Sequence, residues 1–298
     1  MPRVTVGVDA GGTSTIAAVA YDGTVVRTHR GRAANATSCG VEHAADAIAQ
    51  TILEALDGAL PEAIFVGAAG AGRPSVASQI EEALRGRFNG SRVRVGDDAV
   101  IALRSTVPAG DGAVLVAGTG SIAYAEKGDA AFRSGGYGFL LGDPGSGFAI
   151  GCAALKVALH AFEGSGKCSS FVDAVAGACG AKTGPELLEA IYRSDDAVAG
   201  VASLAPLTLD FADNGDREAE KIVQNAALDL AGLAKRVIEL AQLQRSPLVL
   251  AGGLLLQNSL LTLLLETRLE NDLPQVPILR SLQEPWSGAL RAAEQLIR

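Results

Sequence analysis

The feature that most constrains the fold is an order of strands and turns that occurs twice in the chain. Residues 4–30 predict three short strands, with a turn of small residues after the first and an Asp22-Gly23 hairpin signal after the second. Residues 113–133 repeat this order, with a small-residue turn at 118–121. Solenoid repeats have periods of about 20–50 residues, far shorter than the separation of these two copies. Unless two β-meanders recur by chance, the pattern predicts duplicated α/β domains, each with a mixed sheet.

The remaining segments alternate between helix and strand patterns and indicate where the domains divide. Apolar residues recur at helical spacing in most of them, and short buried strands separate the helices. The turn at 108–112 is the best boundary, so we expect an N-terminal domain at 1–110 and a C-terminal domain with helical insertions at 111–285. The predicted strands are 63–68, 92–95, 248–251 and 277–279, and the predicted helices are 41–60, 75–88, 148–162, 169–178, 185–193, 196–210, 217–243, 254–266 and 286–297.

Charge and hydropathy exclude several classes of protein. The 25 Lys and Arg against 33 Asp and Glu give a net charge of −8, which argues against a nucleic-acid groove or an anionic membrane surface as partner. The apolar run 247–265 is about long enough to cross a bilayer, but Gly252-Gly253 and the polar residues 257–259 interrupt it. A strand, a turn and a helix therefore explain this run better than a membrane span.

The N-terminus and the cysteines favour an intracellular location. Residues 1–12 lack the continuous apolar stretch of a secretory signal. The 4 cysteines are far apart and form no CxxC pair, so the sequence suggests neither a disulfide framework nor a zinc ribbon. The 3 histidines show no metal-ligand spacing. We therefore expect a cytoplasmic protein.

The first small-residue turn is a candidate phosphate site. Gly11 and Gly12 would let backbone N–H groups approach phosphate oxygens, and Thr13 could add a hydroxyl donor. The turn leads into a strand, which excludes a Walker P-loop and a Rossmann turn. Asp9 ends an otherwise apolar strand, where it is costly unless it faces a site or a hydrated Mg²⁺. Taken alone, a plain hairpin turn explains this segment equally well.

The second small-residue turn, at 118–121, repeats the arrangement in the second copy. Two glycine-rich hairpins can hold a polyphosphate without any lysine. The pair is therefore more specific than either turn, and the alternative is two unrelated structural turns.

Asp97 and Asp98 form an acidic pair between a predicted strand and a predicted helix. A carboxylate at the C-terminal end of a strand in an open α/β sheet points toward the ligand crevice. Asp is also a preferred helix N-cap. The pair leaves room for both roles, one acid capping the helix and the other acting as a general base toward a hydroxyl.

The segment 134–147 holds six glycines in fourteen residues and one carboxylate, Asp143. Such a loop would let a small polar ligand approach the backbone, with Tyr137 as a wall against a sugar face. A flexible surface loop is the alternative, but Leu140 and Leu141 argue against free exposure.

Two further positions have structural explanations that are as good as the functional ones or better. Asn35, in the polar segment after the third predicted strand, could contact a ligand, although a turn role explains it better when it is taken alone. Gly252-Gly253 ends a buried strand and suits the close approach of a planar base or ribose, or a tight strand-to-helix connection.

In chain order, the motifs resemble one known superfamily. They are DAGGT at 9–13, DDA at 97–99, AGTG at 117–120, GGYG and GDPGSG within 135–147, and LAGG at 250–253. Together they resemble the actin/hexokinase-like ATPase superfamily and, within it, the N-acetylglucosamine kinase and BadF/BadG/BcrA/BcrD-type ATPase family, over essentially the whole length. The resemblance implies duplicated ribonuclease-H-like domains with a central cleft for ATP and sugar, and a last helix, from Trp286, that packs on the first domain.

The resemblance also implies roles for individual residues. Asp9 would organise Mg²⁺ through water, and Asp98 would take the proton from the sugar 6-hydroxyl as it attacks the γ-phosphate. Gly252 and Gly253 would face the adenosine. The phosphates would contact Gly11, Gly12, Thr13, Thr119 and Gly120. The sugar would be lined by Asn35, Asp98, Ser121, Gly136, Tyr137, Gly138 and Asp143.

The implied activity is that of an ATP-dependent hexosamine kinase acting on the 6-hydroxyl of N-acetylglucosamine or glucosamine, with ATP and Mg²⁺. The implied partners are a small sugar and ATP, without nucleic acid or membrane. The sequence leaves open whether the protein forms a homodimer. The alternative is a BadF-type ATPase that couples ATP hydrolysis to a conformational change of a partner protein. A sugar-sensing regulator is disfavoured because no helix-turn-helix or basic patch accompanies the domains.

Three departures from family patterns bear on this interpretation. Animal-type kinases carry Trp where this chain has Tyr137 and Glu where it has Pro144, which leaves the choice of hexosamine open. The closely placed cysteines of the iron–sulfur dehydratase-activating ATPases are missing, which disfavours that function. The zinc-binding cysteine cluster of another bacterial sugar-kinase family is also missing.

Overall fold

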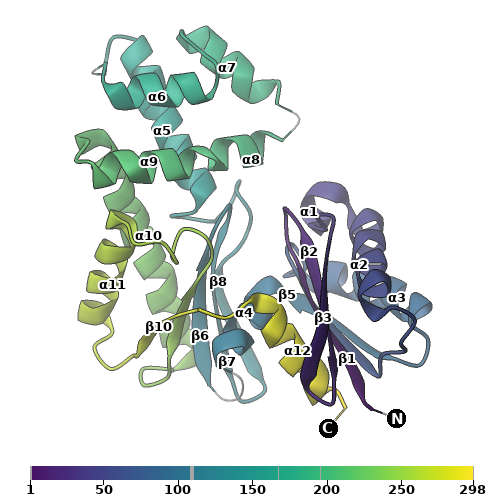
Figure 1. The fold of residues 1–298 in the computed structure, drawn as a ribbon. Coiled ribbons are helices and arrows are strands. Elements are labelled where there is room, and N and C mark those ends of the chain that lie inside the picture. Colours follow the sequence, from purple (N-terminus) through teal and green to yellow (C-terminus); the bar gives the residue numbers. More distant parts are fainter. Residues whose placement is uncertain (1, 108–110, 167, 195, 298) are drawn as a thin grey trace. The chain divides into compact units, whose positions relative to one another are not determined.

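The computed structural model describes residues 2–107, 111–166, 168–194 and 196–297, without the side chains of 37 and 38 (Figure 1). The chain divides into two compact units, one made of Met1–Gly110 with Ser281–Arg298 and the other of Asp111–Arg280. Residues 281–285, which the sequence prediction places in the second domain, therefore group with the first unit. Most of the turn 108–112, the expected boundary, lies outside the described residues.

The first unit is built on a five-stranded sheet. Its strands are β1 (Val4–Ala10), β2 (Thr15–Tyr21), β3 (Thr24–Gly31), β4 (Ala63–Ala68) and β5 (Arg92–Asp97), in the order β3-β2-β1-β4-β5. β1, β2 and β3 are antiparallel neighbours and form the first predicted meander, whereas β4 and β5 continue the sheet parallel to β1. The mixed sheet expected for the first copy is confirmed.

Helices cover both faces of this sheet. They are α1 (Ala36–Cys39), α2 (Val41–Leu56), α3 (Pro74–Arg87), α4 (Asp98–Thr106) and α12 (Pro285–Gln295). Successive residues of a strand point to opposite faces. Val6 and Val8 of β1 are fully buried in the core formed with α2 and α3, whereas Gly7 lies against Leu290 of α12. By this alternation Asp9 points to the α12 face.

The sheet of the second unit repeats that of the first. Its strands are β6 (Gly112–Ala117), β7 (Ser121–Lys127), β8 (Ala130–Gly135), β9 (Leu248–Ala251) and β10 (Ile278–Arg280), in the order β10-β9-β6-β7-β8. β6, β7 and β8 are antiparallel, and β9 and β10 run parallel to β6. The second meander thus heads a sheet with the same strand order and directions, which confirms the expected duplicated α/β fold class.

Helices make up most of the rest of the second unit. The long helix α10 packs on β6, β7 and β8 and carries α11 on its other side, and α5 leads from the sheet toward the smaller helices (Figure 1). The helices are α5 (Gly147–Phe162), α6 (Ser170–Ala178), α7 (Gly184–Tyr192), α8 (Ala197–Ala202), α9 (Leu204–Asp213), α10 (Arg217–Ala241) and α11 (Leu260–Asp272). The predicted helical character of this part of the chain is confirmed.

Two predicted helices of the second unit differ from the structure. The helix expected at 196–210 is two helices, α8 and α9, which meet at Ser203. Pro206 explains the break, because it has no N–H for the carbonyl of residue 202 and its ring would clash with that carbonyl. The helix expected from residue 254 begins only at Leu260, because Ser259 and Thr262 form a reciprocal capping box that fixes the start.

The apolar run 247–265 forms a strand, a turn and the first part of a helix, as predicted. β9 occupies its beginning and α11 starts near its end. Among the residues that the structure describes, no helix is long and apolar enough to cross a membrane.

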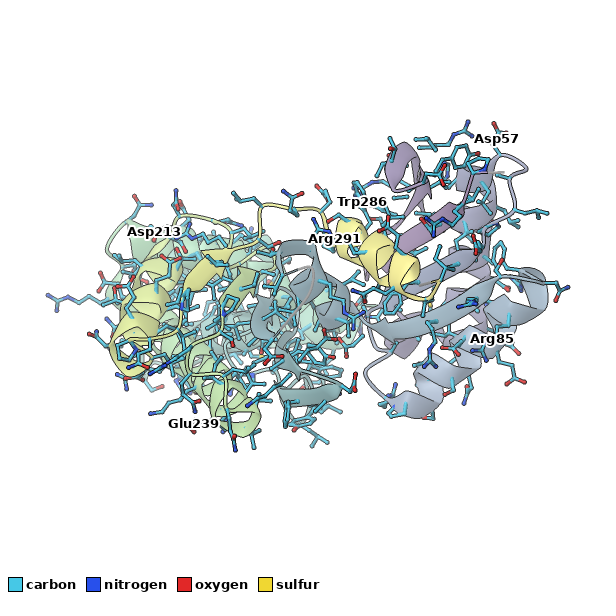
Figure 2. The ribbon with its side chains drawn as sticks, turned by 90° about the horizontal axis from the view of Figure 1, so that it is seen from below. Asp57, Arg85, Asp213, Glu239, Trp286 and Arg291 are labelled. Carbon is cyan, nitrogen blue, oxygen red and sulfur yellow. The ribbon has the colours of Figure 1, made fainter. Side chains whose placement is uncertain are left out.

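The C-terminal helix α12 packs very closely against the rest of the first unit. A methyl group added at Gly7 of β1 would overlap the backbone of α12 at Leu290, and one added at Gly288 would overlap the Ile101 carbonyl oxygen of α4. Arg291, which Figure 2 shows on α12 beside Trp286, donates to the Arg104 carbonyl oxygen of α4 at 2.9 Å. Glycine at both contacts lets α12 lie directly on the backbone of two other elements.

We expect Gly288→Ala to destabilise the first unit by about 1–3 kcal/mol, the range for overpacking a closely packed contact. The new methyl group would meet backbone atoms, which cannot move aside as a flexible side chain could. Urea unfolding followed by the fluorescence of Trp286, the only tryptophan of the chain, measures this change. Gly86→Ala is the matched control, since Gly86 lies in helix α3 of the same unit with nothing within 4 Å of an added methyl. Equal stability of both variants would contradict the close packing of α12.

Candidate active site

The parallel strands of the first sheet end at the same edge. Ala10 of β1 pairs with Ala68 of β4, and Ala68 pairs with Asp97 of β5. The turn after β1 and the start of α4 after β5 therefore emerge side by side. This is the edge at which open α/β sheets bind ligands.

The two acids of the pair at this edge, Asp97 and Asp98, have different environments. Asp97 is the N-cap of α4, and its Oδ1 accepts a hydrogen bond from the Ala99 N–H at 3.0 Å. Asp98 is the first residue of the helix, and its pKa is raised well above 3.8, chiefly by burial. A side-chain hydrogen bond with Asp97 and the negative charges of Asp97 and Asp9 raise the pKa further. The neighbour that caps the helix thus also makes Asp98 a stronger base.

Asp9 lies on the α12 face of the same edge. Burial raises its pKa to about 6, with a smaller contribution from the negative charge of Glu284. Glu284 is the N-cap residue of α12, although its side chain makes no capping hydrogen bond. The sequence analysis did not predict Glu284 as part of the site, because only the packing of α12 on β1 brings these distant residues together.

This arrangement of acids is compatible with a bound divalent cation. Asp9 lies within electrostatic reach of Asp98 and of Glu284, and the negative charge of these neighbours adds to the effect of burial in raising the pKa values of the two aspartates. Mg²⁺ typically binds proteins through one or two carboxylates and keeps several waters. In the described part of the chain, no group of three or more His, Cys, Asp or Glu is arranged to hold a metal ion. The water-mediated contact of Asp9 with Mg²⁺ therefore stays a prediction.

The first glycine turn is closed by backbone hydrogen bonds and leaves its tip open. The Gly11 N–H donates to the Ser14 carbonyl oxygen at 3.0 Å, and the Gly11 carbonyl accepts from the Ala34 N–H at 3.0 Å. Gly12 and Thr13 are exposed. A methyl group added at Gly12 would lie 3.8 Å from Asn35 Nδ2, so the structure brings Asn35 beside this turn. Both stay candidates for ligand contact.

The second glycine turn is attached to the start of α5. The Gly118 carbonyl accepts from the Gly147 N–H at 2.7 Å, and the Thr119 carbonyl accepts from the Phe148 N–H at 3.2 Å. The Thr119 side chain is exposed. A methyl group added at Gly120 would lie 2.7 Å from Asp143 Oδ2. The residues predicted for phosphate and for sugar contact are therefore neighbours in this unit.

Asp143 is buried at the base of the glycine-rich loop. It accepts hydrogen bonds from the backbone N–H groups of Gly138, at 3.3 Å, and of Ser121. Burial raises its pKa, whereas these two N–H groups and the positive charge of Arg133 oppose the shift. The Ser121 hydroxyl donates to the Pro144 carbonyl at 2.8 Å and so anchors the loop. The result is a fixed carboxylate with acceptor capacity beyond these bonds.

The tip of this loop differs from the sequence prediction. Leu140 and Leu141 are 81% and 85% exposed, so the inference that they argue against free exposure was wrong. The Gly142 N–H donates to the Gly138 carbonyl oxygen at 2.8 Å and closes a tight turn, which places both leucines at its tip. Tyr137 is also exposed, and the Arg133 guanidinium lies 5.5 Å from its ring centroid.

The predicted nucleoside glycines have different surroundings. Gly252 has φ +91°, and an added methyl group would overlap the Ala117 carbonyl oxygen, so the fold itself requires this glycine. Gly253 is exposed with nothing within 4 Å of an added methyl. The Gly253 carbonyl accepts from Gln257 Nε2 at 2.8 Å, which folds the turn that leads to α11.

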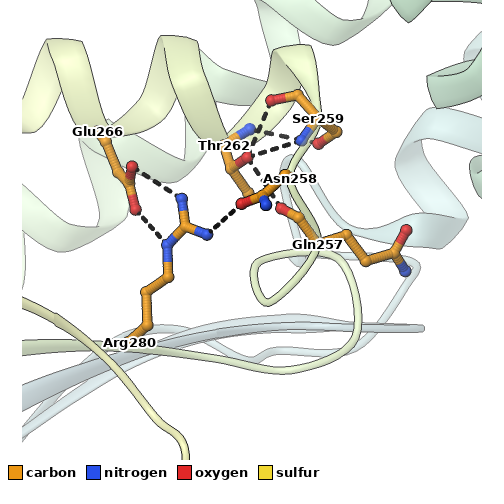
Figure 3. Close-up of polar contacts among 6 residues, drawn as sticks. All are labelled: Gln257, Asn258, Ser259, Thr262, Glu266 and Arg280. Atoms are coloured by element: carbon orange, nitrogen blue, oxygen red, sulfur yellow. Dashed lines mark hydrogen bonds and ion pairs between the residues drawn. The ribbon is translucent and has the colours of Figure 1, made fainter.

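A cavity of about 670 Å³ opens in the second unit, and neither Gly252 nor Gly253 is among its lining residues. One wall comes from the connection between α9 and α10, and the other from the start of α11 and the end of β10. Arg280, whose guanidinium contacts Glu266 and Asn258, forms part of it, and the sequence analysis did not predict this residue (Figure 3). The lining residues are Ala212, Asp213, Gly215, Glu220, Asn258, Ser259, Leu260, Thr262, Leu263, Glu266 and Arg280.

Comparisons with known proteins identify relatives over nearly the whole chain. An N-acetylmuramic acid/N-acetylglucosamine kinase of Clostridium acetobutylicum is 33% identical over 233 residues, 76% of each chain. An N-acetyl-D-glucosamine kinase of Dictyostelium discoideum is 29% identical over 96% of each chain. A solved structure from Chromobacterium violaceum, described as a candidate N-acetylglucosamine kinase, matches with a TM-score of 0.77 and 25% identity over 97% of this chain and 98% of that one. The model of the BadF/BadG/BcrA/BcrD ATPase family matches residues 6–294, and the chain therefore belongs to this family.

Proposed function

We propose that this protein is an ATP-dependent hexosamine kinase that phosphorylates the 6-hydroxyl of N-acetylglucosamine or glucosamine. The observation that carries the proposal is the division of roles at the edge of the first sheet. Asp97 caps α4, which leaves Asp98 as a half-buried base with a raised pKa, and Asp9 lies at the same edge. Two relatives named as N-acetylglucosamine kinases, one of them at 33% identity, support the choice of substrate class.

The first unit would supply the base and the cation. Asp98 would accept the proton of the sugar hydroxyl as its oxygen attacks the γ-phosphorus, a contribution of about 10²–10⁴-fold for general bases. When bound at Asp9, Mg²⁺ would supply positive charge against the phosphate oxygens. The exposed Gly12 and Thr13 would offer donors to the phosphates, with Asn35 beside them.

The second unit would bind sugar and nucleotide. Asp143, fixed by two backbone N–H groups, would accept hydrogen bonds from sugar hydroxyls, and the exposed Tyr137 would cover a sugar face. The turn at Thr119 and Gly120 would contact phosphate.

The cavity lined by Asn258 and Arg280 would suit a nucleoside better than a phosphate. Its three acidic residues, Asp213, Glu220 and Glu266, outnumber its one cation, Arg280, which is already paired. A negatively charged lining of this kind suits the base and ribose hydroxyls.

Phosphorylation of a sugar panel tests this function directly. ADP release with ATP and Mg²⁺ should depend on the added sugar and be fastest with N-acetylglucosamine or glucosamine. N-acetylmannosamine, N-acetylmuramate and glucose complete the panel, and the product should carry phosphate on its 6-oxygen. ADP release that no sugar stimulates and that a partner protein stimulates would contradict the kinase and favour the ATPase alternative.

We expect Asp98→Asn to lower kcat by about 10²–10⁴-fold, with ATP affinity largely intact, because an amide cannot accept the proton. In the wild type, kcat/KM should fall as the pH falls through the raised pKa of Asp98, since only the carboxylate acts as base.

Asp97→Asn is the matched control for Asp98→Asn. Asn caps helices as well as Asp does, so this variant should retain most of the activity. Removing the charge of Asp97 should lower the pKa of Asp98 and move the acid limb of kcat/KM to lower pH. An unchanged kcat in Asp98→Asn would rule out this residue as the base.

We expect Asp143→Asn to raise the KM for the sugar by about 10–100-fold, the effect of losing a hydrogen bond to a charged group. Asn tolerates the positive φ of 57° at this position, so the loop should keep its shape.

Gly120→Ala should also raise the KM for the sugar, because its methyl group would displace the Asp143 carboxylate. Gly118→Ala, in the same turn with nothing within 4 Å, is the control. A sugar KM that stays constant in Asp143→Asn would refute the sugar contact.

A further inference from the structure

Arg280 occupies a special place in the second sheet. It is the last residue of β10 and pairs with Leu250 of β9, just before the Gly252 turn. β10 is the edge strand that corresponds to β5 in the first sheet, which ends at Asp97. The ends of two equivalent strands thus carry an acid in one unit and an arginine in the other.

Arg280 joins two residues on the wall of the cavity (Figure 3). Its Nε donates to Glu266 Oε1 at 2.7 Å and its Nη2 donates to Glu266 Oε2 at 2.9 Å. The guanidinium therefore binds both carboxylate oxygens. Its Nη1 donates to Asn258 Oδ1 at 2.7 Å. The pair with Glu266 is partly buried, with 31% and 27% of the side chains exposed. Fork-shaped arginine–carboxylate pairs of this kind are geometrically specific.

The bond from Arg280 fixes the oxygen end of the exposed Asn258 amide. Because Arg280 occupies Oδ1, the Nδ2 group remains as the free donor. Within the described ranges, no residue accepts a hydrogen bond from Asn258 Nδ2, and Asn258 lines the cavity. Without the guanidinium, either end of the amide could face the ligand.

The segment that carries Asn258 is fixed on both sides. Thr262 Oγ1 donates to the Gln257 carbonyl at 3.0 Å and accepts from the Ser259 N–H at 3.0 Å. On the opposite wall, Asp213 accepts from the Leu260 N–H at 2.6 Å. These hydrogen bonds hold the backbone on both sides of Asn258 in place.

Ring nitrogens of a purine and ribose oxygens are hydrogen-bond acceptors, which matches the amide NH₂ group that Asn258 presents. We propose that Arg280 is a positioning residue for the nucleotide, which holds Asn258 by its oxygen so that Nδ2 donates to the nucleoside in this cavity. The proposal rests on the proposed function, in which the nucleoside of ATP occupies this cavity. Arg280 itself acts through Asn258 and Glu266, both of which it contacts directly.

Two variants separate this role from a merely structural one. Arg280→Lys keeps the charge but cannot grip both Glu266 oxygens and reach Asn258 at once. Asn258→Asp keeps an acceptor for Arg280 and replaces the Nδ2 donor by a negatively charged acceptor oxygen. Each should weaken ATP binding, measured by calorimetry without sugar, by about tenfold, the loss of one hydrogen bond. The KM for ATP should rise equally, while kcat and the KM for the sugar stay unchanged.

The double variant gives the sharpest readout. If both residues act through one donor, Arg280→Lys with Asn258→Asp should lose no more affinity than either single variant. Arg268→Lys is the matched control, because Arg268 lies on α11, as Glu266 does, and pairs with Asp272 at 2.9 Å away from the cavity lining. It should bind ATP as the wild type does.

Unchanged ATP affinity in Asn258→Asp, or losses that multiply in the double variant, would overturn the proposal. Calorimetry distinguishes this failure from that of the proposed function. A wild type that phosphorylates hexosamines while both variants bind ATP normally refutes only the role of Arg280. A wild type that turns over no sugar but binds ATP, with weakened variants, refutes only the kinase assignment and supports the role of Arg280. A wild type that binds no ATP refutes both.

Discussion

The packing of α12 on β1 and α4 is the contact on which the polar edge of the first unit depends. Gly7 and Gly288 allow the helix to rest on the backbone of its neighbours, where any larger side chain would overlap. This close approach brings Glu284, at the helix start, within electrostatic reach of Asp9 and helps to raise its pKa to about 6. The position of an acid beside the proposed catalytic edge therefore depends on two glycines buried in helix packing.

The glycines of this chain serve two purposes that the sequence alone does not separate. Gly253 borders open space, and a methyl group added at Gly12 would be in ordinary contact with Asn35 Nδ2 at 3.8 Å, so both positions leave room for the proposed ligands. Gly252 and Gly288 instead relieve overlaps inside the fold. Gly120 does both, since it lies in a predicted phosphate turn and leaves room for the Asp143 carboxylate. A glycine-rich motif thus marks where backbone comes close to something, and only the structure shows whether that neighbour is a ligand or the protein.

Local sequence patterns were enough to predict most of the fold. The features that could not be predicted depend on tertiary contacts. The two meanders, the strands β4, β5 and β9 and the N-terminal position of the Asp97-Asp98 pair follow from alternation and capping rules that act over a few residues. Glu284 and Arg280 escaped prediction because each acquires its role from a partner in another element, Asp9 and Asn258 respectively. The exposure of Leu140 was misjudged for a related reason, since apolar character does not reveal that a tight turn places the residue at a loop tip.

The two sheets share strand order and direction, yet the same edge carries opposite chemistry in each. In the first, the equivalent edge strand ends in Asp97, and burial with neighbouring negative charge makes Asp98 a stronger base. In the second, the strand ends in Arg280, whose charge is matched by Glu266, so no uncompensated cation results from it. What remains there are neutral donors, the backbone of the glycine turns and the amide of Asn258. A duplicated scaffold can therefore separate proton transfer from nucleotide binding, because substitution at one strand end changes the charge of an edge without changing the sheet that supports it.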